Sequence, residues 1–317
     1  MRDQIISKYF NKDLAYIILK YDYFIEGKID KVLRGHTDWV TCVSVLPSKD
    51  GGQIVSGSHD KTCIIWKDDG EIDKVLRGHQ SFISCISVLP SKDGEQIVTG
   101  SWDNTCIIWN PKSGEIDKIL EGHTNSVTCV SLLPSKDGGR IVSGSDDNTC
   151  IIWKHNGEID KILRGHIDWV NCISILPSKD GGQIISGSSD CTCILWKPNG
   201  EINTVYKGHT HYVTCVDILP NGQIMSGSRD KILIIWKLNG EIDKIYKGHT
   251  NNITCISILP NGQIVSGSWD KTCIIWNHDG EIDTVCRGHT DYIRCISVLP
   301  NKRIISGSLD NNLIIWK

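Results

Sequence analysis

Short apolar segments alternate with polar turns along most of the chain. In one stretch, the segments 40–47, 53–58, 62–66 and 71–76 are rich in Ile, Val, Thr and Cys, and Gly, Asp, Lys and Ser fill the turns between them. β-Branched residues in runs this short predict strands rather than helices. The second and third segments are apolar at nearly every position, which predicts strands covered on both faces. The fourth alternates charged and apolar residues, which predicts a half-exposed outer edge.

This group of four segments recurs along the chain. Each copy begins after a Gly-His pair, and successive pairs lie 40 to 44 residues apart. The seven pairs are Gly35-His36, Gly78-His79, Gly122-His123, Gly165-His166, Gly208-His209, Gly248-His249 and Gly288-His289. The differences in length fall in turns, which leaves the strands in register. The repeat predicts an all-β fold: a seven-bladed β-propeller of four-stranded antiparallel blades.

The two ends of the repeated region are complementary. A fourth segment at 28–34 has no preceding partners, whereas the last copy stops at Lys317, directly after a third segment. We expect segment 28–34 to pair with the last three segments, because this pairing completes the seventh blade and removes an open sheet edge. The predicted propeller domain therefore spans residues 26–317.

Residues 1–25 do not follow the repeat. Leu14, Ile17, Ile18 and Tyr21 are spaced like one face of a helix. This spacing predicts a short N-terminal helical extension over residues 1–25. The extension either packs on the propeller or docks another protein.

The repeats resemble those of the WD-repeat family of seven-bladed propellers. The resemblance covers residues 28–317 and rests on seven copies of Gly-His, of Ser-x-Asp and of a Trp at fixed spacing. The Trp-Asp of the family is here Trp-Lys or Trp-Asn, as in Trp66-Lys67 and Trp109-Asn110. The Ile-, Asn- and Lys-rich sequence is similar to WD-repeat proteins of giant viruses. Residues 1–25 resemble the end of an adaptor domain that precedes propellers in some ubiquitin-ligase substrate receptors.

The resemblance implies a structural tetrad of His, Ser, Asp and Trp in every copy. In the first copy these residues are His36, Ser56, Asp60 and Trp66. The matching His, Asp and Trp residues of the other copies are His79, Asp103 and Trp109; His123, Asp147 and Trp153; His166, Asp190 and Trp196; His209, Asp230 and Trp236; His249, Asp270 and Trp276; and His289, Asp310 and Trp316. Such a chain of hydrogen bonds satisfies buried imidazole and indole groups. A nucleophilic triad is needed only once, in a cleft. Seven equivalent His-Ser-Asp sets therefore indicate a structural role, and we expect no catalytic residues.

Composition narrows the class of protein. The formal net charge of −3 argues against a general nucleic-acid binder, and no apolar run is long enough to span a membrane. All but two of the 14 Cys occupy two repeated positions, one of which also takes Leu, so we expect them to act as buried apolar side chains. No Cys-x-x-Cys pair is present, so neither a metal nor another cofactor is expected. This many thiols favours a reducing compartment, and we expect the cytoplasm, with the nucleus as the alternative.

Positions that differ between the repeats are expected to carry specificity. Two such positions, the third residue after the His and the residue before the tetrad Asp, are expected at the same end of each blade because the tetrad joins their loops. They hold four of the 11 Trp. The predicted partner-binding residues are Trp39, Phe82, Trp102, Asp146, Trp169, Tyr212, Arg229, Trp269 and Tyr292. These rings either anchor a partner or pack against neighbouring loops.

Aromatic rings interleaved with charges suit a peptide that carries Arg or Lys, through cation–π contacts and carboxylates. RNA could stack on the same rings, but the sequence has no basic patch. We therefore expect a monomeric, non-catalytic scaffold that binds peptides or protein domains on its aromatic loop face, with no nucleic-acid or membrane partner. Two alternatives stay open: a substrate receptor of a ubiquitin-ligase complex and, from another class, a propeller enzyme.

Overall fold

The computed structural model describes residues 29–46, 53–67, 69–91, 94–133, 139–154, 156–176, 182–299 and 301–317. The predicted helical extension, residues 1–25, lies outside these ranges. The regular elements of the described residues are strands, and none of these residues forms a helix that is long and apolar enough to cross a membrane.

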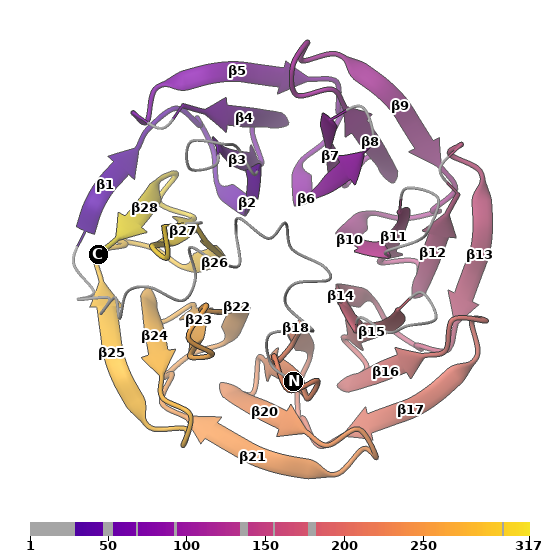
Figure 1. The fold of residues 1–317 in the computed structure, drawn as a ribbon, viewed down its shortest axis with the longest axis vertical. Coiled ribbons are helices and arrows are strands. Elements are labelled where there is room, and N and C mark those ends of the chain that lie inside the picture. Colours follow the sequence, from indigo (N-terminus) through magenta and orange to yellow (C-terminus); the bar gives the residue numbers. More distant parts are fainter. Residues whose placement is uncertain are drawn as a thin grey trace.

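The strands form seven antiparallel sheets of four strands each, set as blades around a common axis (Figure 1). From the axis outward, blade 1 contains β2 (Val40–Leu46), β3 (Gln53–Ser58), β4 (Thr62–Trp66) and β5 (Ile72–Arg77). The next three blades are β6 (Ile83–Ser91), β7 (Gly94–Ser101), β8 (Thr105–Trp109) and β9 (Ile116–Glu121); β10 (Val127–Leu133), β11 (Arg140–Ser145), β12 (Thr149–Trp153) and β13 (Ile159–Arg164); and β14 (Val170–Leu176), β15 (Gln183–Ser188), β16 (Thr192–Trp196) and β17 (Ile202–Lys207).

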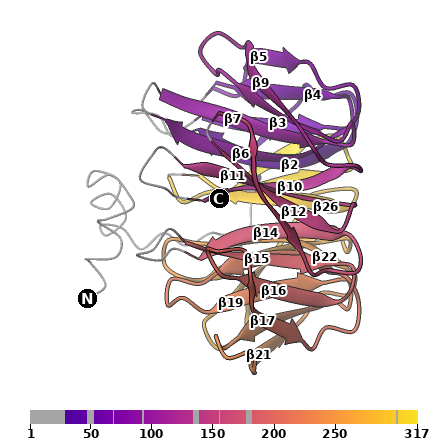
Figure 2. The ribbon, with the colours of Figure 1, turned by 90° about the vertical axis from the view of Figure 1, so that its right-hand side faces the viewer.

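Blades 5 and 6 are β18 (Val213–Ile218), β19 (Ile224–Ser228), β20 (Ile232–Trp236) and β21 (Ile242–Lys247); and β22 (Ile253–Ile258), β23 (Ile264–Ser268), β24 (Thr272–Trp276) and β25 (Ile282–Arg287). Blade 7 contains β26 (Ile293–Val298), β27 (Ile304–Ser308), β28 (Leu313–Trp316) and, as its outer strand, β1 (Ile29–Leu33). Seen from the side, the ring is shorter along its axis than across it (Figure 2). The predicted seven-bladed propeller is confirmed.

Blade 7 closes the ring with strands from both ends of the described chain. β1 pairs with β28 in antiparallel register, with Val32 opposite Ile314. Asp30 on β1 forms ion pairs with Arg303 and, at 2.9 Å, with Lys317. The hydrogen bond from Lys317 outweighs partial burial and lowers the pKa of Asp30. The predicted closure is therefore confirmed, and charged side chains reinforce it.

The hydrophobic core lies between adjacent blades. The two middle strands of blade 1 are almost wholly buried, whereas β5 is largely exposed, as the alternating pattern predicted. Between blades 1 and 2, Cys42 and Ile65 pack against Ile83 and Trp109. The blades approach closely here: a Cβ on Gly57 would lie 2.6 Å from the Cys42 sulfur and 2.7 Å from a methyl carbon of Ile83. Glycine is required at this position because no side chain fits between the blades.

Candidate functional site

A chain of hydrogen bonds crosses each blade at one end. In blade 1, His36 Nδ1 lies 2.8 Å from Asp60 Oδ2 and His36 Nε2 lies 2.8 Å from Ser56 Oγ. Trp66 Nε1 donates to the same Ser56 oxygen at 2.7 Å. The other six blades contain the same bonds. The expectation of a Ser in every copy is wrong in blade 2, where Thr99 supplies the hydroxyl because its Oγ1 bonds in the same way.

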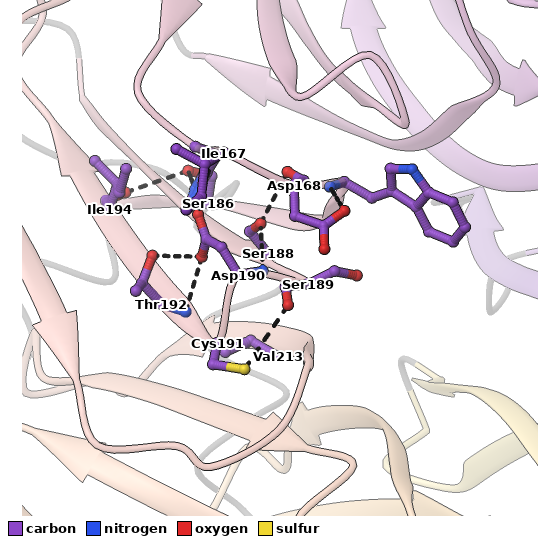
Figure 3. Close-up of polar contacts among 12 residues, drawn as sticks. Ile167, Asp168, Ser186, Ser188, Ser189, Asp190, Cys191, Thr192, Ile194 and Val213 are labelled. Carbon is purple, nitrogen blue, oxygen red and sulfur yellow. Dashed lines mark hydrogen bonds and ion pairs between the residues drawn. The ribbon is translucent and has the colours of Figure 1, made fainter.

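The Asp of each tetrad is held in its charged form. Figure 3 shows this site in blade 4, with Ser186, Asp190 and Thr192. Burial alone would raise the pKa of Asp190, but hydrogen bonds from His166 and Thr192 outweigh it and lower the pKa to about 2. The Ser186 side chain is fully buried and also accepts a bond from Trp196. A substrate cannot reach a hydroxyl in this position, so the geometry fits a structural role.

The tetrads fix the loops that carry the variable positions. In blade 1, Ser58 Oγ donates to Asp38 O at 3.0 Å and accepts from the Asp60 backbone N–H. The His59 backbone N–H donates to Trp39 O at 3.0 Å. The equivalent backbone bonds join Trp102 to Phe82, Asp146 to Ser126, Ser189 to Trp169, Arg229 to Tyr212, Trp269 to Asn252 and Leu309 to Tyr292. The structure thus brings both variable positions of every blade together at one end of the ring, which we call the loop face.

Aromatic rings of blades 1 and 2 contact one another on the loop face. The His59 ring stacks on Phe82 with centroids 4.2 Å apart and also lies 4.9 Å from Trp39 and 5.8 Å from Trp102. These four residues form the first aromatic cluster. Trp39 and Trp102 stay 44% and 48% exposed, whereas Phe82 is half-buried beneath its neighbours. The interpretation that these rings pack against neighbouring loops holds for this cluster, because each ring contacts at least one other. That Trp39 and Trp102 anchor a partner stays a prediction.

A second cluster spans blades 5 to 7. The Trp269 ring stacks on Tyr292 with centroids 5.0 Å apart. The Arg229 guanidinium carbon lies 5.0 Å from the Tyr212 centroid and 5.5 Å from the Trp269 centroid. We call Tyr212, Arg229, Trp269 and Tyr292 the second aromatic cluster. The Trp269 Nε1 atom is buried and has no hydrogen-bond partner in the described residues.

Blades 3 and 4 make the loop face acidic between these clusters. Asp146 is half-buried, and within the described residues its carboxylate has no hydrogen bond or ion pair. Burial, with the charges of Asp147 and Asp168, raises the pKa of Asp146 to about 6. Asp168 instead accepts a bond from the Trp169 backbone N–H at 2.8 Å, and Figure 3 shows it on the loop beside Ser189. Trp169 is 49% exposed, whereas Ser189 is buried.

Two charged residues on the innermost strands were missed by the sequence interpretation. The second residue of the innermost strand bonds the next blade in six blades; an example is Thr41 Oγ1, which donates to Ile83 O at 2.5 Å. The others are Ser84, Thr128, Asn171, Thr214 and Thr254. Blade 7 has Arg294 at this position, and blade 5 has Asp217 where the fifth residue is otherwise Ser. At each of these two positions, one repeat differs from the other six. A comparison of the first segments of the seven repeats would have shown both differences.

Other site chemistry is sparse in the described part of the chain. No three His, Cys, Asp or Glu side chains there are placed to hold a metal ion. All 14 Cys are free, and 13 of them are buried. Burial raises the pKa of the Cys42 thiol to about 12, which makes it unreactive at neutral pH.

Comparisons with known proteins agree with the geometry. The sequence model described as "WD domain, G-beta repeat" matches residues 27–67, 70–110, 114–154, 157–197, 200–237, 240–277 and 280–317. No curated protein sequence matches the chain significantly. Among many similar solved structures, the WD40 β-propeller domain of Doa1 has a TM-score of 0.82 and 26% identity, over 93% of this chain and 97% of that one. The first matched segment runs from β1 to β4, so each sequence repeat contributes strands to two neighbouring blades.

Proposed function

Because this chain belongs to the WD-repeat family, we propose that it is a non-catalytic scaffold that holds a peptide segment or a domain of another protein on its loop face. The supporting observation is the placement of Trp. The seven tetrad Trp are at most 1% exposed, whereas Trp39, Trp102 and Trp169 are 44–49% exposed on one face. Large exposed rings around a common axis are typical of interface anchors.

Exposed Ile residues elsewhere do not compete with this proposal. Ile72, Ile116 and Ile159 are each about 40% exposed at the same position of successive outer strands. They contact the Gly-His glycines, as Ile72 does near Gly35. A residue repeated around the circumference cannot define one binding site, whereas the loop face differs from blade to blade.

The acidic part of the loop face suggests the chemistry of one partner residue. Within the described part of the chain, the Asp146 carboxylate has no hydrogen-bond or ion-pair partner. The loop of Trp169 follows in the next blade, and the charge of Asp168 in this loop contributes to the raised pKa of Asp146. A carboxylate and an exposed indole together suit an Arg or Lys side chain, by an ion pair and a cation–π contact. We propose that the partner segment places a basic side chain here.

Selection from a displayed library of random peptides tests the scaffold. We expect the full chain to enrich peptides whose affinity falls at least about tenfold when Trp102 and Trp169 are both changed to Ala, because about 1.4 kcal/mol per lost anchor already gives that factor. The melting temperature should change little, since both rings are about half exposed.

The matched control is Ile119→Ala, which removes an equally exposed apolar side chain from an outer strand. It should leave peptide affinity unchanged. Peptides that bind the double Trp variant as tightly as the original chain would reject the loop face as the binding surface.

A further inference from the structure

Arg294 lies at a strand position where the other six blades have a residue that links neighbouring blades by a hydrogen bond. In six blades the matching side chain bonds a backbone carbonyl of the next blade, as Thr254 Oγ1 bonds Ile293 O at 2.7 Å. Within the described residues Arg294 makes no such bond to blade 1, and its side chain is exposed to solvent. A Thr would complete the set of bonds, so the guanidinium removes a stabilising contact from the fold. A cost of this kind points to a function for the Arg.

A second cation lies in the same part of the loop face. Two residues before Arg294, the Tyr292 ring stacks on Trp269, and the Trp269 centroid lies 5.5 Å from the Arg229 guanidinium carbon. Desolvation by the surrounding protein, which has the largest effect, and the charge of Arg229 both lower the pKa of Arg294, although its side chain keeps surface that solvent can reach. The two guanidinium groups therefore repel one another. The charge of Arg294 also reaches His59 on the neighbouring blade 1. Burial, which has the largest effect, and this charge outweigh the opposing charge of Asp38 and lower the pKa of His59. No ion pair in the described part of the chain includes either Arg. Two cations without a counter-ion favour an added anion.

The nearby carboxylates are already engaged by their own loops. Asp38 accepts from the Trp39 backbone N–H, and Asp291 accepts from the Tyr292 backbone N–H, both at 2.8 Å. By contrast, the buried Nε1 donor of Trp269 has no acceptor among the described residues. Buried indole donors are normally satisfied. The region therefore combines two guanidinium groups with a buried indole donor, while Asp38 and Asp291 each hold one backbone N–H of their own loop.

We infer that Arg294 and Arg229 form an anion-binding pocket for a carboxylate or phosphate group of the partner segment, with Trp269 Nε1 as a further donor. The inference rests on the proposed function for the source of its ligand, but its geometry is independent of it. Guanidinium groups bind both anions through paired N–H donors. With Asp146 and Trp169 on blades 3 and 4, the loop face then has an acidic and a basic pole, which fixes the direction of a segment with one basic and one anionic side chain.

Parallel selections of random peptides on three full-length proteins test the pocket. These are the original chain, Arg294→Thr and the control Arg77→Thr, which removes an exposed Arg from outer strand β5. We expect the original chain and the control to enrich Asp or Glu at one fixed peptide position, and Arg294→Thr to lose this enrichment. The affinity of a selected peptide should fall about tenfold or more on Arg294→Thr. A phosphoserine in place of the acidic residue then shows which anion binds more tightly.

The melting temperature supplies an independent readout. Arg294→Thr should melt at the same or a higher temperature than the original chain, because Thr restores the bond found in six blades. Equal acidic enrichment on Arg294→Thr, or enrichment of peptides without an acidic residue, overturns the pocket and leaves the scaffold proposal intact. If no peptide is enriched at all, the scaffold proposal fails. Calorimetric titration of inorganic phosphate then decides the pocket alone: binding that Arg294→Thr abolishes supports it, and absence of binding overturns it.

Discussion

At the scale of single residues, Asp217 shows how one departure from the repeat lowers the folding stability. Six blades have Ser at this position of the innermost strand. Burial raises the pKa of Asp217 to about 6, although the Ile218 backbone N–H and Ser174 Oγ both donate to it. In an unfolded chain the pKa of Asp is about 3.9. The folded state therefore binds more protons between about pH 4 and 6, and stability falls as the pH rises through this window.

Asp217→Ser should consequently stabilise the protein mainly at high pH. We expect a gain of about 1–2 kcal/mol at pH 8, where the ionised carboxylate is unfavourable, and a much smaller gain at pH 4. Urea unfolding at the two pH values measures the difference. Asp283→Ser removes a carboxylate from exposed strand β25 and should show no such dependence. An equal effect of Asp217→Ser at both pH values would contradict the raised pKa.

At the scale of strands, the closure of the ring by β1 can be measured by hydrogen exchange. β1 pairs with β28 along the same kind of antiparallel ladder that binds β5 to β4. Amides of β1 should therefore exchange at rates similar to those of the six other outer strands. Amides of the buried middle strands, such as β3 and β4, should exchange far more slowly. Exchange of β1 much faster than of β5, β9 and β13 would show that the ring opens in solution.

The strands were predictable from sequence because each rests on a local pattern. Segments 53–58 and 62–66 coincide with β3 and β4, and segment 71–76 is offset by one residue from β5. The sequence also located the loop-face residues, but it could not tell which of their side chains are exposed and which are covered by a neighbour. Whether Phe82 stands free depends on the His59 ring of the preceding blade, 4.2 Å away, and such contacts are between residues far apart in sequence. Arg294 was missed because it lies on an innermost strand, whereas the differences between repeats were expected to carry specificity in the loops.

At the scale of the whole molecule, the seven tetrads make the folding stability fall at low pH. In every blade hydrogen bonds from His lower the pKa of the tetrad Asp against the opposing effect of burial. For Asp310 the pKa is about 2, below the value of about 3.9 in unfolded chains. The unfolded state therefore binds more protons between these values. The stabilisation by each carboxylate is complete above about pH 4 and is lost as the pH falls towards 2.

Because the seven tetrads stabilise one closed ring, protonation of their Asp residues should destabilise the same unfolding unit. We expect the free energy of unfolding to fall steeply between about pH 4 and 2, with uptake of several protons on unfolding. Asp310→Asn cannot take up its proton. It should therefore be about 1–3 kcal/mol less stable than the original chain at pH 5, and the difference should shrink towards zero at pH 2. Urea unfolding across this range measures both curves. A difference that stays constant down to pH 2 would show that the Asp310 carboxylate does not carry the acid sensitivity of blade 7.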